Sequence, residues 1–319
     1  MKLQQLHYVL EIANHGNHLS AAADALHTSQ PGVSRQLQLL EAELGFEIFA
    51  RTRNRIDGLT EPGRIVVDIA KRIMSDVDAL ASLKADLAAT NRGTLTIATT
   101  HTQANYVLPK VIGPFVSAYP DVQVILKQGD PEGICAMVDA AEADLAIGTE
   151  ALHEFPGLVN LPCFTMPRVV VAPTGHPILD GGDLTLERIA EYPIITYDSR
   201  FSGHRKTRAA FERAGLSPKV VLSAIDAGVC KTYVKMGLGL AILTKITFDP
   251  TQDVDLHALD ADHLFESSTT YIKMRPNTYL RPYLLEFIRR FAPQLTPDVV
   301  REALTRKHPP AIHATAIRT

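Results

Sequence analysis

The sequence predicts an α/β protein with a mainly helical N-terminal part, and three observations support this fold class. Residues 1–44 contain three short segments with apolar residues at helical spacing, and residues 61–89 carry a longer stripe of the same kind. From Thr94 onward, short apolar strands alternate with helical patterns, which is typical of parallel sheets covered by helices. A length of 319 residues leaves room for two or more compact units with sizeable cores.

The composition is that of an ordinary globular protein, with 46% hydrophobic and 21% charged residues. No uninterrupted apolar stretch approaches the roughly 20 residues that a membrane helix needs, and the first residues show no secretory pattern, so we expect a cytoplasmic protein without a membrane partner. Cys135, Cys163 and Cys230 form no CxxC pair, which favours reduced, mostly buried thiols over a zinc site. Because the formal net charge is -3, any DNA binding must depend on local basic clusters.

The first two short helices are predicted over residues 3–13 and from Ser20 to Leu26, with Ser20 as the N-cap of the second. A third helix begins near Pro31, which suits a first helical turn, and ends at Gly45. Its predicted buried stripe follows helical spacing and consists of Val33, Leu37, Leu40 and Leu44. The exposed face that remains is polar and consists of Gln30, Ser34, Arg35 and Gln38.

Two short helices, a tight turn and a third helix with a polar outer face are the layout of a helix-turn-helix, whose last helix enters the major groove of DNA. Many helical bundles share this layout, and polar helix faces are often simply solvated, so the pattern alone leaves both interpretations open. Two short strands at 47–50 and 56–59 predict a hairpin wing, which favours DNA binding. Its basic side chains suit phosphate or minor-groove contacts and belong to Arg51, Arg53 and Arg55.

A long helix is predicted from Thr60, as its cap, to about Ala89. Apolar residues near heptad spacing form one stripe along it, which Asp76 interrupts. At about 1.5 Å per residue the helix would be roughly 40 Å long, more than one small domain covers, so we expect the stripe to meet a second copy of the chain. The stripe consists of Val66, Ile69, Ile73, Leu80, Leu83 and Leu87.

The remainder of the chain alternates predicted strands and helices. After Pro293 the sequence becomes basic and contains several prolines. We expect a C-terminal tail over residues 301–319, which ends in an unpatterned and frayed segment from Lys307-His308-Pro309-Pro310 onward. The predicted strands are at 94–99, 122–127, 143–148, 169–172, 194–197, 220–224 and 238–243. The predicted helices are at 104–118, 131–141, 205–214, 228–237 and 283–291.

Residues 99–103, with the sequence Thr-Thr-His-Thr-Gln, follow a predicted strand and open a predicted helix. Helix N-termini present free N–H groups and the positive end of the helix dipole, so these side chains can complete an anion site. Thr149 ends another predicted strand, and α/β sheets bind ligands beyond the carboxyl ends of their strands. Threonines are also ordinary strand and cap residues. His101 has no second ligand or nucleophile fixed beside it, so we interpret it as a polar helix-start residue rather than a catalytic or metal-binding one.

Residues 20–63 contain a pattern of several parts: Ser20-Ala21-Ala22 through Leu26, Ser29-Gln30-Pro31 with Ser34, Leu40-Glu41 with Leu44-Gly45, Phe49-Ala50-Arg51, and Leu59-Thr60 with Gly63. This pattern resembles the signature of the LysR-type regulators. The resemblance implies a winged helix-turn-helix DNA-binding domain over 1–60 and a linker and dimerisation helix over 61–90.

The same resemblance implies roles for single residues in DNA binding. Gln30, Pro31, Ser34 and Arg35 would begin the recognition helix. Ser34, Arg35 and Gln38 would read or flank bases, Ser29 and Gln30 would contact the backbone, and the wing arginines would hold phosphates. Helix capping is an equal alternative for Thr28 and Ser29.

Further segments resemble the CysB branch of this family, and the similarity runs from Met1 to about Val300. The resemblance implies an effector-binding domain over 91–300 with a two-lobed fold like the periplasmic binding proteins (type 2). Lobe I would comprise about 91–163 and 268–293, and lobe II about 164–267. The segments are Thr99 to Gln103, Tyr106 with Leu108-Pro109, Tyr119-Pro120, Gln128-Gly129 with Pro131, Ala143-Asp144 with Ala146-Ile147, Thr149 to His153, Leu161-Pro162-Cys163, Lys231 to Val234 and Phe291-Ala292-Pro293.

The resemblance also implies control of sulfur assimilation or cysteine genes in response to sulfate, thiosulfate or O- or N-acetylserine, without a cofactor. Two departures leave the effector open: Ser202 stands where the branch usually has threonine, and Met166, near the pocket mouth, replaces a frequent large aromatic residue. With Arg200 or His204, a bulkier acid or an adenylylated sulfate is an alternative, although each is more often a surface residue. A pocket of neutral donors suits a fully deprotonated tetrahedral anion such as sulfate. Carried over by position, the pocket residues are Thr99, Thr100, Thr102, Gln103, Thr149 and Ser202.

We expect a homodimer or homotetramer that binds double-stranded promoter DNA through paired recognition helices. Effector binding would change lobe closure, and with it the angle between subunits and the bend of the DNA. RNA polymerase is a further expected partner. The alternatives are a LysR-type regulator with a different small-acid effector, or a cytosolic solute-binding protein whose N-terminal helices only dimerise. An enzyme is disfavoured because the sequence has no recognisable Ser/His/Asp arrangement, P-loop, dinucleotide glycine fingerprint or metal-ligand cluster.

Overall fold

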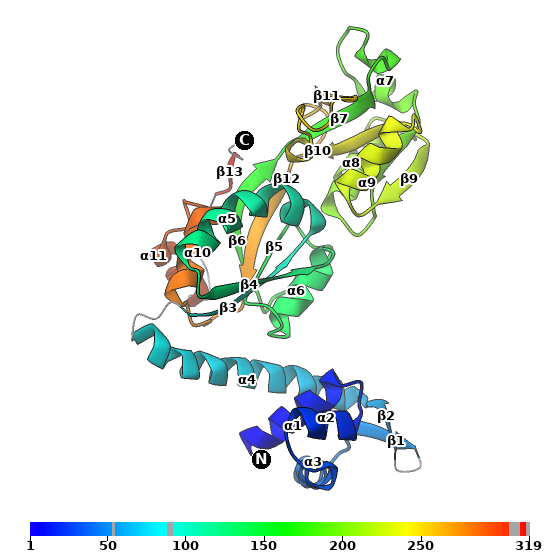
Figure 1. Cartoon of the computed structure of the whole chain (residues 1–319). Coiled ribbons are helices and arrows are strands. Elements are labelled where there is room, and N and C mark those ends of the chain that lie inside the picture. Colours follow the sequence, from blue (N-terminus) through cyan, green and yellow to red (C-terminus); the bar gives the residue numbers. More distant parts are fainter. Residues whose placement is uncertain (53–54, 88–91, 306–312, 317–319) are drawn as a thin grey trace. The chain divides into compact units, whose positions relative to one another are not determined.

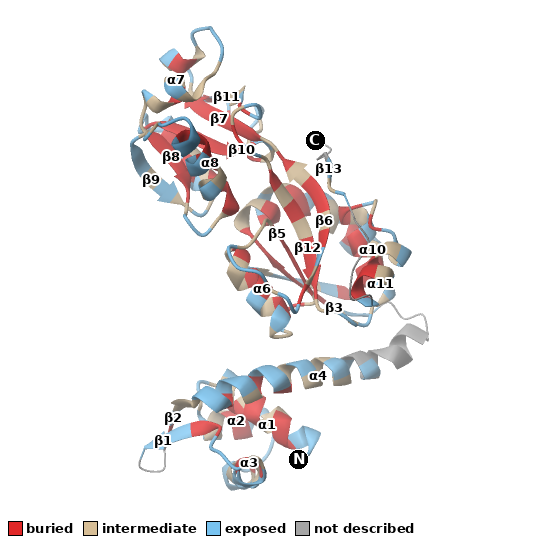
Figure 2. Ribbon diagram, turned by 180° about the vertical axis from the view of Figure 1, so that it is seen from behind, coloured by how far each residue is buried: buried red, intermediate tan, exposed pale blue. Residues whose placement is uncertain are grey.

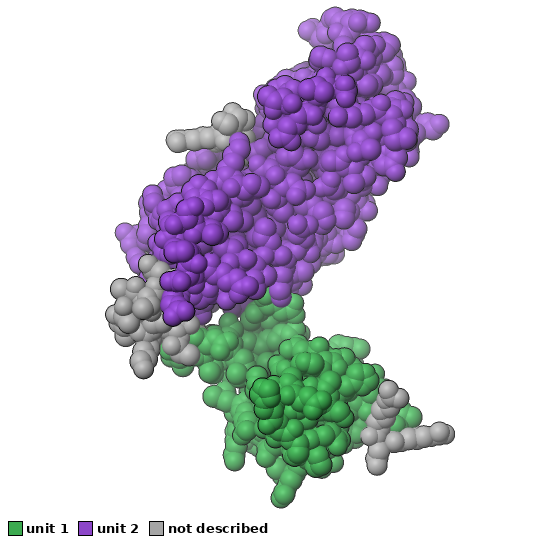
Figure 3. Space-filling model, in the orientation of Figure 1, with its two compact units in different colours: residues 1–90, 140–142 green, residues 91–139, 143–319 purple. Residues whose placement is uncertain are grey.

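The computed structural model describes residues 1–52, 55–87, 92–305 and 313–316. The chain forms two compact units, drawn in green and purple in Figure 3: residues 1–90 with 140–142, and residues 91–139 with 143–319. Among the described helices, none is long and apolar enough to cross a membrane.

The first unit consists of three short helices, a hairpin and one long helix, as the sequence predicted (Figure 1). The two strands of the hairpin pair in antiparallel fashion, and the faces of the helices that point inward form one apolar core. The elements are α1 (Leu3–Asn14), α2 (Leu19–Ala25), α3 (Gln30–Leu44), β1 (Phe49–Thr52), β2 (Arg55–Leu59) and α4 (Glu61–Leu87).

The ends of these helices follow the predicted signals with one exception. Gly45 ends α3 with a φ of 82°, a left-handed conformation that favours glycine. The prediction of Ser20 as an N-cap is wrong, because α2 already begins at Leu19, after His18. The helix therefore begins two residues earlier than predicted, with Leu19 packed against the apolar core and Ser20 exposed in the first turn.

Helix α4 begins with the predicted cap. The Thr60 hydroxyl accepts a hydrogen bond from the Gly63 N–H at 2.9 Å. Gly63 has no room for a side chain, because an added Cβ would lie 1.9 Å from the carbonyl oxygen of Ile48. The predicted stripe divides along the helix: Val66 and Ile73 pack against the core of the first unit, whereas Ile69 and Leu80 are exposed. The side chains of Leu83 and Leu87 lie outside the described residues.

The second unit contains two mixed sheets, each with its own helices, which we call lobe I and lobe II. The lobe I sheet has six strands in the order β13-β6-β12-β5-β3-β4. Its strands are β3 (Gly93–Thr99), β4 (Val122–Gln128), β5 (Leu145–Gly148), β6 (Val159–Met166), β12 (Ser268–Met274) and β13 (Thr315–Ala316). Its helices are the π-helix η1 (Gln103–Val107), α5 (Leu108–Ala118), α6 (Pro131–Asp139), α10 (Pro282–Phe291) and α11 (Pro297–Thr305).

The lobe II sheet has five strands in the order β11-β7-β10-β8-β9. Buried residues follow the inner strands of both sheets (Figure 2). The strands of lobe II are β7 (Arg168–Pro173), β8 (Ile194–Tyr197), β9 (Val220–Ala224), β10 (Leu240–Thr244) and β11 (Leu256–Asp260). Its helices are η2 (Pro177–Leu179), α7 (Leu186–Ala190), α8 (Ser202–Arg213), α9 (Ala227–Lys235) and η3 (Lys245–Thr247).

All the strands predicted after residue 93 are present, but the sequence analysis missed β6, β11, β12 and β13. The prediction of parallel sheets was therefore incomplete, because β12 pairs antiparallel with β5 and β6, and β11 pairs antiparallel with β7. Strands β6 and β12 contain polar as well as apolar residues, and β6 also contains Pro162. They therefore lack the plain apolar run of a buried strand. The two strands connect the lobes, since the chain leaves lobe I at the end of β6 and returns through β12.

The C-terminal end contains a helix that was not predicted, α11, and a strand at Thr315–Ala316 where fraying was expected. Helix α11 buries Val300, Ala303 and Leu304 in the core of lobe I. Strand β13 pairs in parallel with β6, and the Thr315 hydroxyl donates a hydrogen bond to the Cys163 carbonyl at 3.1 Å. Residues 306–312 and 317–319 lie outside the described residues.

Candidate functional site

Helix α3 presents a polar face on the surface of the first unit. Val33, Leu37 and Leu40 are buried, which confirms the predicted stripe and orients the helix. The polar residues that the sequence singled out are therefore turned outward. Ser29, Gln30, Pro31, Arg35 and Gln38 are exposed, and Ser34 is partly buried.

The hairpin wing is joined to α3 by a buried carboxylate that the sequence analysis did not single out for this role. Glu41 is 7% exposed and accepts hydrogen bonds from the Ile48 N–H at 2.9 Å and the Phe49 N–H at 3.3 Å. Its other oxygen pairs with Arg51 at 2.6 Å. Arg51 therefore holds the wing against α3, and its predicted contact with a DNA phosphate stays a prediction. Arg53 and the side chain of Arg55 lie outside the described residues.

A small cavity lies between the two lobes and has a volume of about 30 Å³. Six of the seven predicted ligand-binding residues line it, from both lobes. The exception is Thr99, which is fully buried behind the wall, where its hydroxyl donates to the Ile147 carbonyl at 3.0 Å. The lining residues are Thr100, Thr102, Gln103, Thr149, Met166, Arg168, Tyr197, Phe201, Ser202, Gly203, Thr244 and Ser268.

The lobe I side of the cavity is formed where two neighbouring parallel strands end. Strands β3 and β5 pair with each other, so Thr100 and Thr149, which follow them, meet at the same edge of the sheet. Gly148 makes this approach possible, because an added Cβ would lie 2.5 Å from Ile134 Cδ1 and 3.2 Å from Thr100 Cγ2.

Gln103 begins the π-helix η1 and is completely buried in the cavity wall. Its Nε2 donates to the Thr270 hydroxyl at 2.9 Å, and its Oε1 has no partner among the described residues. The two atoms of a side-chain amide can exchange places by rotation. In the other orientation Oε1 would accept from Thr270, and Nε2 would be a donor for a ligand. Short π-helices are frequent at functional sites, which fits this position.

The lobe II side of the cavity contains a buried arginine that the sequence analysis missed. Arg168 is 1% exposed, and its Nη2 donates to the Ser268 hydroxyl at 2.5 Å. Its Nε has no hydrogen-bond partner, and its guanidinium makes no ion pair among the described residues, since the nearby Glu150 and Glu266 pair with Lys206. Burial lowers the pKa of Arg168. The predicted pocket of neutral donors is therefore corrected to one that also contains a cation.

Two further features tie Arg168 to the cavity. An added Cβ on Gly203 would lie 3.0 Å from both Nη1 and Nη2 of Arg168, so the guanidinium packs closely against this glycine. The Ser202 hydroxyl lies 3.1 Å from that of Ser268, so hydroxyls from both lobes meet beside the guanidinium. The signal that could have found Arg168 is its place as the one charged residue in the apolar run 168–172.

Ion pairs join the two lobes beside the cavity. Arg200 of lobe II pairs with Asp130 of lobe I at 2.9 Å and with its neighbour Asp198 at 2.8 Å. Lys206 of lobe II pairs with Glu150 of lobe I at 3.0 Å. Burial alone would raise the pKa of Glu150, but hydrogen bonds from the Thr269 N–H and Lys206 lower it.

The side chains that the sequence analysis considered for a bulkier acid have partners within the chain. Arg200 forms the ion pairs just described. His204 bonds through Nδ1 to the Tyr197 carbonyl at 2.8 Å. All three cysteines are free and buried, as their spacing predicted. In the part of the chain that the structure describes, no cluster of three or more His, Cys, Asp or Glu residues fits a metal ion.

Two family models match the chain. Residues 3–64 match the model for "Bacterial regulatory helix-turn-helix protein, lysR family". Residues 88–296 match the model for "LysR substrate binding domain". The first match contains the polar face of α3 and the wing, and the second contains every residue that lines the cavity between the lobes.

Single proteins with similar sequences agree with these matches. The chain is 46% identical over 295 residues to the HTH-type transcriptional regulator SsuR of Burkholderia cenocepacia, covering 92% of this chain and 96% of that one. It is 44% identical over 304 residues to the HTH-type transcriptional regulator CysB of the same organism, covering 95% and 97%. The crystal structure of the cofactor-binding domain of the Cbl transcriptional regulator is 37% identical, with a TM-score of 0.64, and covers 67% of this chain and 95% of that one.

These relatives are regulators and not enzymes, which confirms that an enzyme was rightly disfavoured. Both parts of the chain match one family, and long stretches are more than 40% identical to its members. The chain therefore belongs to the LysR family of bacterial helix-turn-helix transcriptional regulators.

Proposed function

We propose that this regulator acts in the cytoplasm and controls genes of sulfur assimilation or cysteine synthesis in response to a small sulfur oxyanion bound between its lobes. The observation that supports an anionic ligand is the buried guanidinium of Arg168. It makes no ion pair among the described residues and lines the cavity. A buried charge costs free energy unless it is paired, so a dianion in the cavity would supply the missing partner.

The size of the cavity favours sulfate or thiosulfate over the larger candidates. A single water needs roughly 10–15 Å³ of such volume, so about 30 Å³ suits a small inorganic ion. O- or N-acetylserine and adenylylated sulfate need more space, and so do most small acids. A small acid other than a sulfur oxyanion is the alternative effector. The hydroxyls of Thr100, Thr102, Thr149 and Ser202 would donate to the oxygens of the anion, and the Arg168 guanidinium would contribute charge-assisted hydrogen bonds.

Thermal-shift measurements on the full chain test the effector. We expect sulfate or thiosulfate to raise the melting temperature with the logarithm of its concentration above the dissociation constant. Inorganic phosphate, O-acetylserine, N-acetylserine and adenylylated sulfate are the comparison ligands. If one of these or an unrelated acid stabilises the protein while the sulfur oxyanions do not, the proposed effector is wrong.

The outward face of α3 would read promoter DNA. The exposed Arg35 and Gln38 are suited to base edges in the major groove. We expect Arg35→Ala to weaken operator binding by about 1–3 kcal/mol in gel-shift titrations at fixed salt. Sulfate affinity of the same variant should be unchanged, because α3 belongs to the other compact unit. If the variant bound the operator as tightly as wild type, Arg35 would not contact the DNA.

The long helix α4 would join two copies of the chain. Its exposed apolar side chains include Ile65, Ile69 and Leu80, which are 59%, 41% and 67% exposed. Covering them against a second α4 would bury this surface and place two recognition helices on one DNA duplex. A homodimer is the smallest assembly that places two recognition helices on one DNA duplex. A homotetramer would span two such DNA sites. RNA polymerase is proposed as the further partner at the promoter.

A further inference from the structure

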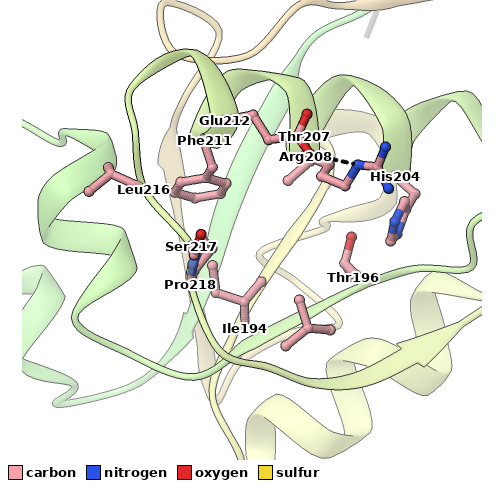
Figure 4. A pocket seen from close by; sticks show the side chains of 11 residues that line it. Ile194, Thr196, His204, Thr207, Arg208, Phe211, Glu212, Leu216, Ser217 and Pro218 are labelled. Atoms are coloured by element: carbon pink, nitrogen blue, oxygen red, sulfur yellow. Dashed lines mark ion pairs between the residues drawn. The ribbon is translucent and has the colours of Figure 1, made fainter.

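A second cavity lies in lobe II, between α8 and the edge of the sheet, and we call it the α8 cavity. It has a volume of about 260 Å³, much larger than the cavity between the lobes. Its apolar wall comes from β8, α8 and the turn that leads to β9. Figure 4 shows Phe211, Leu216 and Pro218 at one end and Thr196 and His204 at the other.

The α8 cavity contains a hydroxyl group that nothing in the described chain satisfies. Thr196 is 3% exposed, and its Oγ1 has no hydrogen-bond partner among the described residues. A buried hydroxyl without a partner costs free energy, so such groups in native structures usually meet water or a ligand. The Thr196 side chain lines the cavity, and a molecule bound there would supply the partner.

The other polar groups define what kind of molecule fits. His204 shares the polar end of the cavity, and its Nδ1 bonds to the Tyr197 carbonyl, which leaves Nε2 as an acceptor in the neutral ring. Arg208 is paired with Glu212 at 3.1 Å, so the two charges at the rim cancel. A ligand with a hydroxyl group would therefore have both a donor and an acceptor beside it and would need no charge.

We propose that the α8 cavity is a second ligand site for a small uncharged organic molecule with an apolar body and one hydroxyl group. An apolar cavity of about 150 Å³ binds benzene, so the larger α8 cavity has room for a substituted ring. Phe211 would contact the ring, and Thr196 and His204 would bond to the hydroxyl.

The two cavities of lobe II share one strand and one helix. Successive side chains of a strand point to opposite faces, so on β8 Thr196 lines the α8 cavity and Tyr197 lines the cavity between the lobes. On α8, Ser202 and Gly203 line the cavity between the lobes, and His204 and Phe211 line the α8 cavity. A ligand in the α8 cavity that shifts α8 would change the affinity for the anion. This coupling rests on the proposed anion site, whereas binding to the α8 cavity does not.

The test uses the full chain and p-cresol as the probe, first without any oxyanion. Saturation-transfer NMR should give saturable binding of p-cresol and weaker binding of toluene, which lacks the hydroxyl. Thr196→Val keeps the shape of the side chain and removes its hydroxyl, so p-cresol should bind about tenfold more weakly to it. Thr196→Ser, which keeps the hydroxyl, is the matched control and should restore binding. Thermal melting of each variant checks that it is folded.

Two results would overturn the proposal: no saturable binding of p-cresol to the wild-type chain, or equal binding to wild type and to folded Thr196→Val. The coupling is measured afterwards, by titrating sulfate with and without saturating p-cresol. Linkage requires that each ligand change the affinity of the other by the same factor. If p-cresol binds and sulfate does not, the proposed ligand site in the α8 cavity is supported and the proposed anion site is wrong.

Discussion

The Arg168 guanidinium determines the charge of the cavity between the lobes at the scale of single residues. It is held by the Ser268 hydroxyl and enclosed by Gly203, so it cannot turn toward solvent. Without an anion, its charge is buried at a cost that the rest of lobe II must offset. Such an arrangement lowers the stability of the ligand-free protein, and under the proposed function it would raise the affinity for an anion.

Arg168→Met separates these two effects. We expect sulfate affinity to fall by about 10- to 100-fold, because a charge-assisted hydrogen bond contributes about 1.5–3 kcal/mol. The melting temperature without sulfate should stay equal or rise, because an apolar side chain of similar length replaces an uncompensated buried charge. Calorimetric titration and thermal melting measure the two quantities, with the exposed Arg213→Met as the control. A variant that keeps wild-type sulfate affinity would show that Arg168 does not contact the anion.

At the scale of elements, the two lobes are joined by side chains beside the cavity. In the pair between Arg200 and Asp130 the arginine is 55% exposed, and pairs with an exposed partner contribute little, about 0–1 kcal/mol. The pair between Lys206 and Glu150 is more buried, and Glu150 also accepts from the Thr269 N–H at 3.1 Å. The contact through Glu150 therefore contributes more to lobe closure.

The stability supplied by Glu150 should depend on pH. Its pKa is lowered in the folded protein from 4.5, because bonds from the Thr269 N–H and Lys206 outweigh the opposing effect of burial. A lowered folded-state pKa contributes stability above the unfolded value, and this stability is lost as the pH falls through the folded-state pKa. The melting temperature of wild type should exceed that of Glu150→Gln at neutral pH, and the difference should shrink below pH 4.5. A difference that is the same at every pH would contradict this role, and the exposed Glu212→Gln is the control.

In the described part of the first unit, helix α4 carries three exposed large apolar side chains, those of Ile65, Ile69 and Leu80. Ile69→Glu and Leu80→Glu place a charge in the exposed stripe, and we expect both variants to shift the assembly toward monomers. Sedimentation velocity measures the distribution, and Asp68→Lys, an exposed residue of the same helix, is the control. Unchanged assembly of both variants would place the dimer contact elsewhere.

At the scale of the whole molecule, the anion can act on DNA only if it binds one lobe arrangement more tightly than another. We expect sulfate to change the DNase footprint or the bend of an operator fragment bound by the full chain. Arg168→Met should bind the same DNA and show no response to sulfate, because its recognition helix is untouched. A wild-type footprint that is identical with and without sulfate would contradict the proposed mechanism.

Local patterns were sufficient for much of the fold and part of the cavity. The helices of the first unit, its hairpin and the strands of both sheets with plain apolar runs follow from periodicity and caps, because the forces behind them act between neighbours in the chain. Four residues of the cavity were also predicted from sequence, since they stand at strand ends, where a parallel sheet binds its ligands: Thr100, Thr102, Gln103 and Thr149. Resemblance to one family supplied Ser202 and Met166.

Only the tertiary structure decided the features that depend on contacts between distant segments. The sequence by itself determined most of the helices and strands and which of their faces are apolar. The single charge in the apolar run 168–172 did not show that Arg168 is buried, because its burial depends on Gly203 and Ser268, which come from other elements. The sequence also concealed strands β6, β12 and β13, whose pairing satisfies polar backbone groups that no local pattern reveals. The burial of a charge and the pairing of strands depend on segments that are distant in sequence and that only the fold brings together.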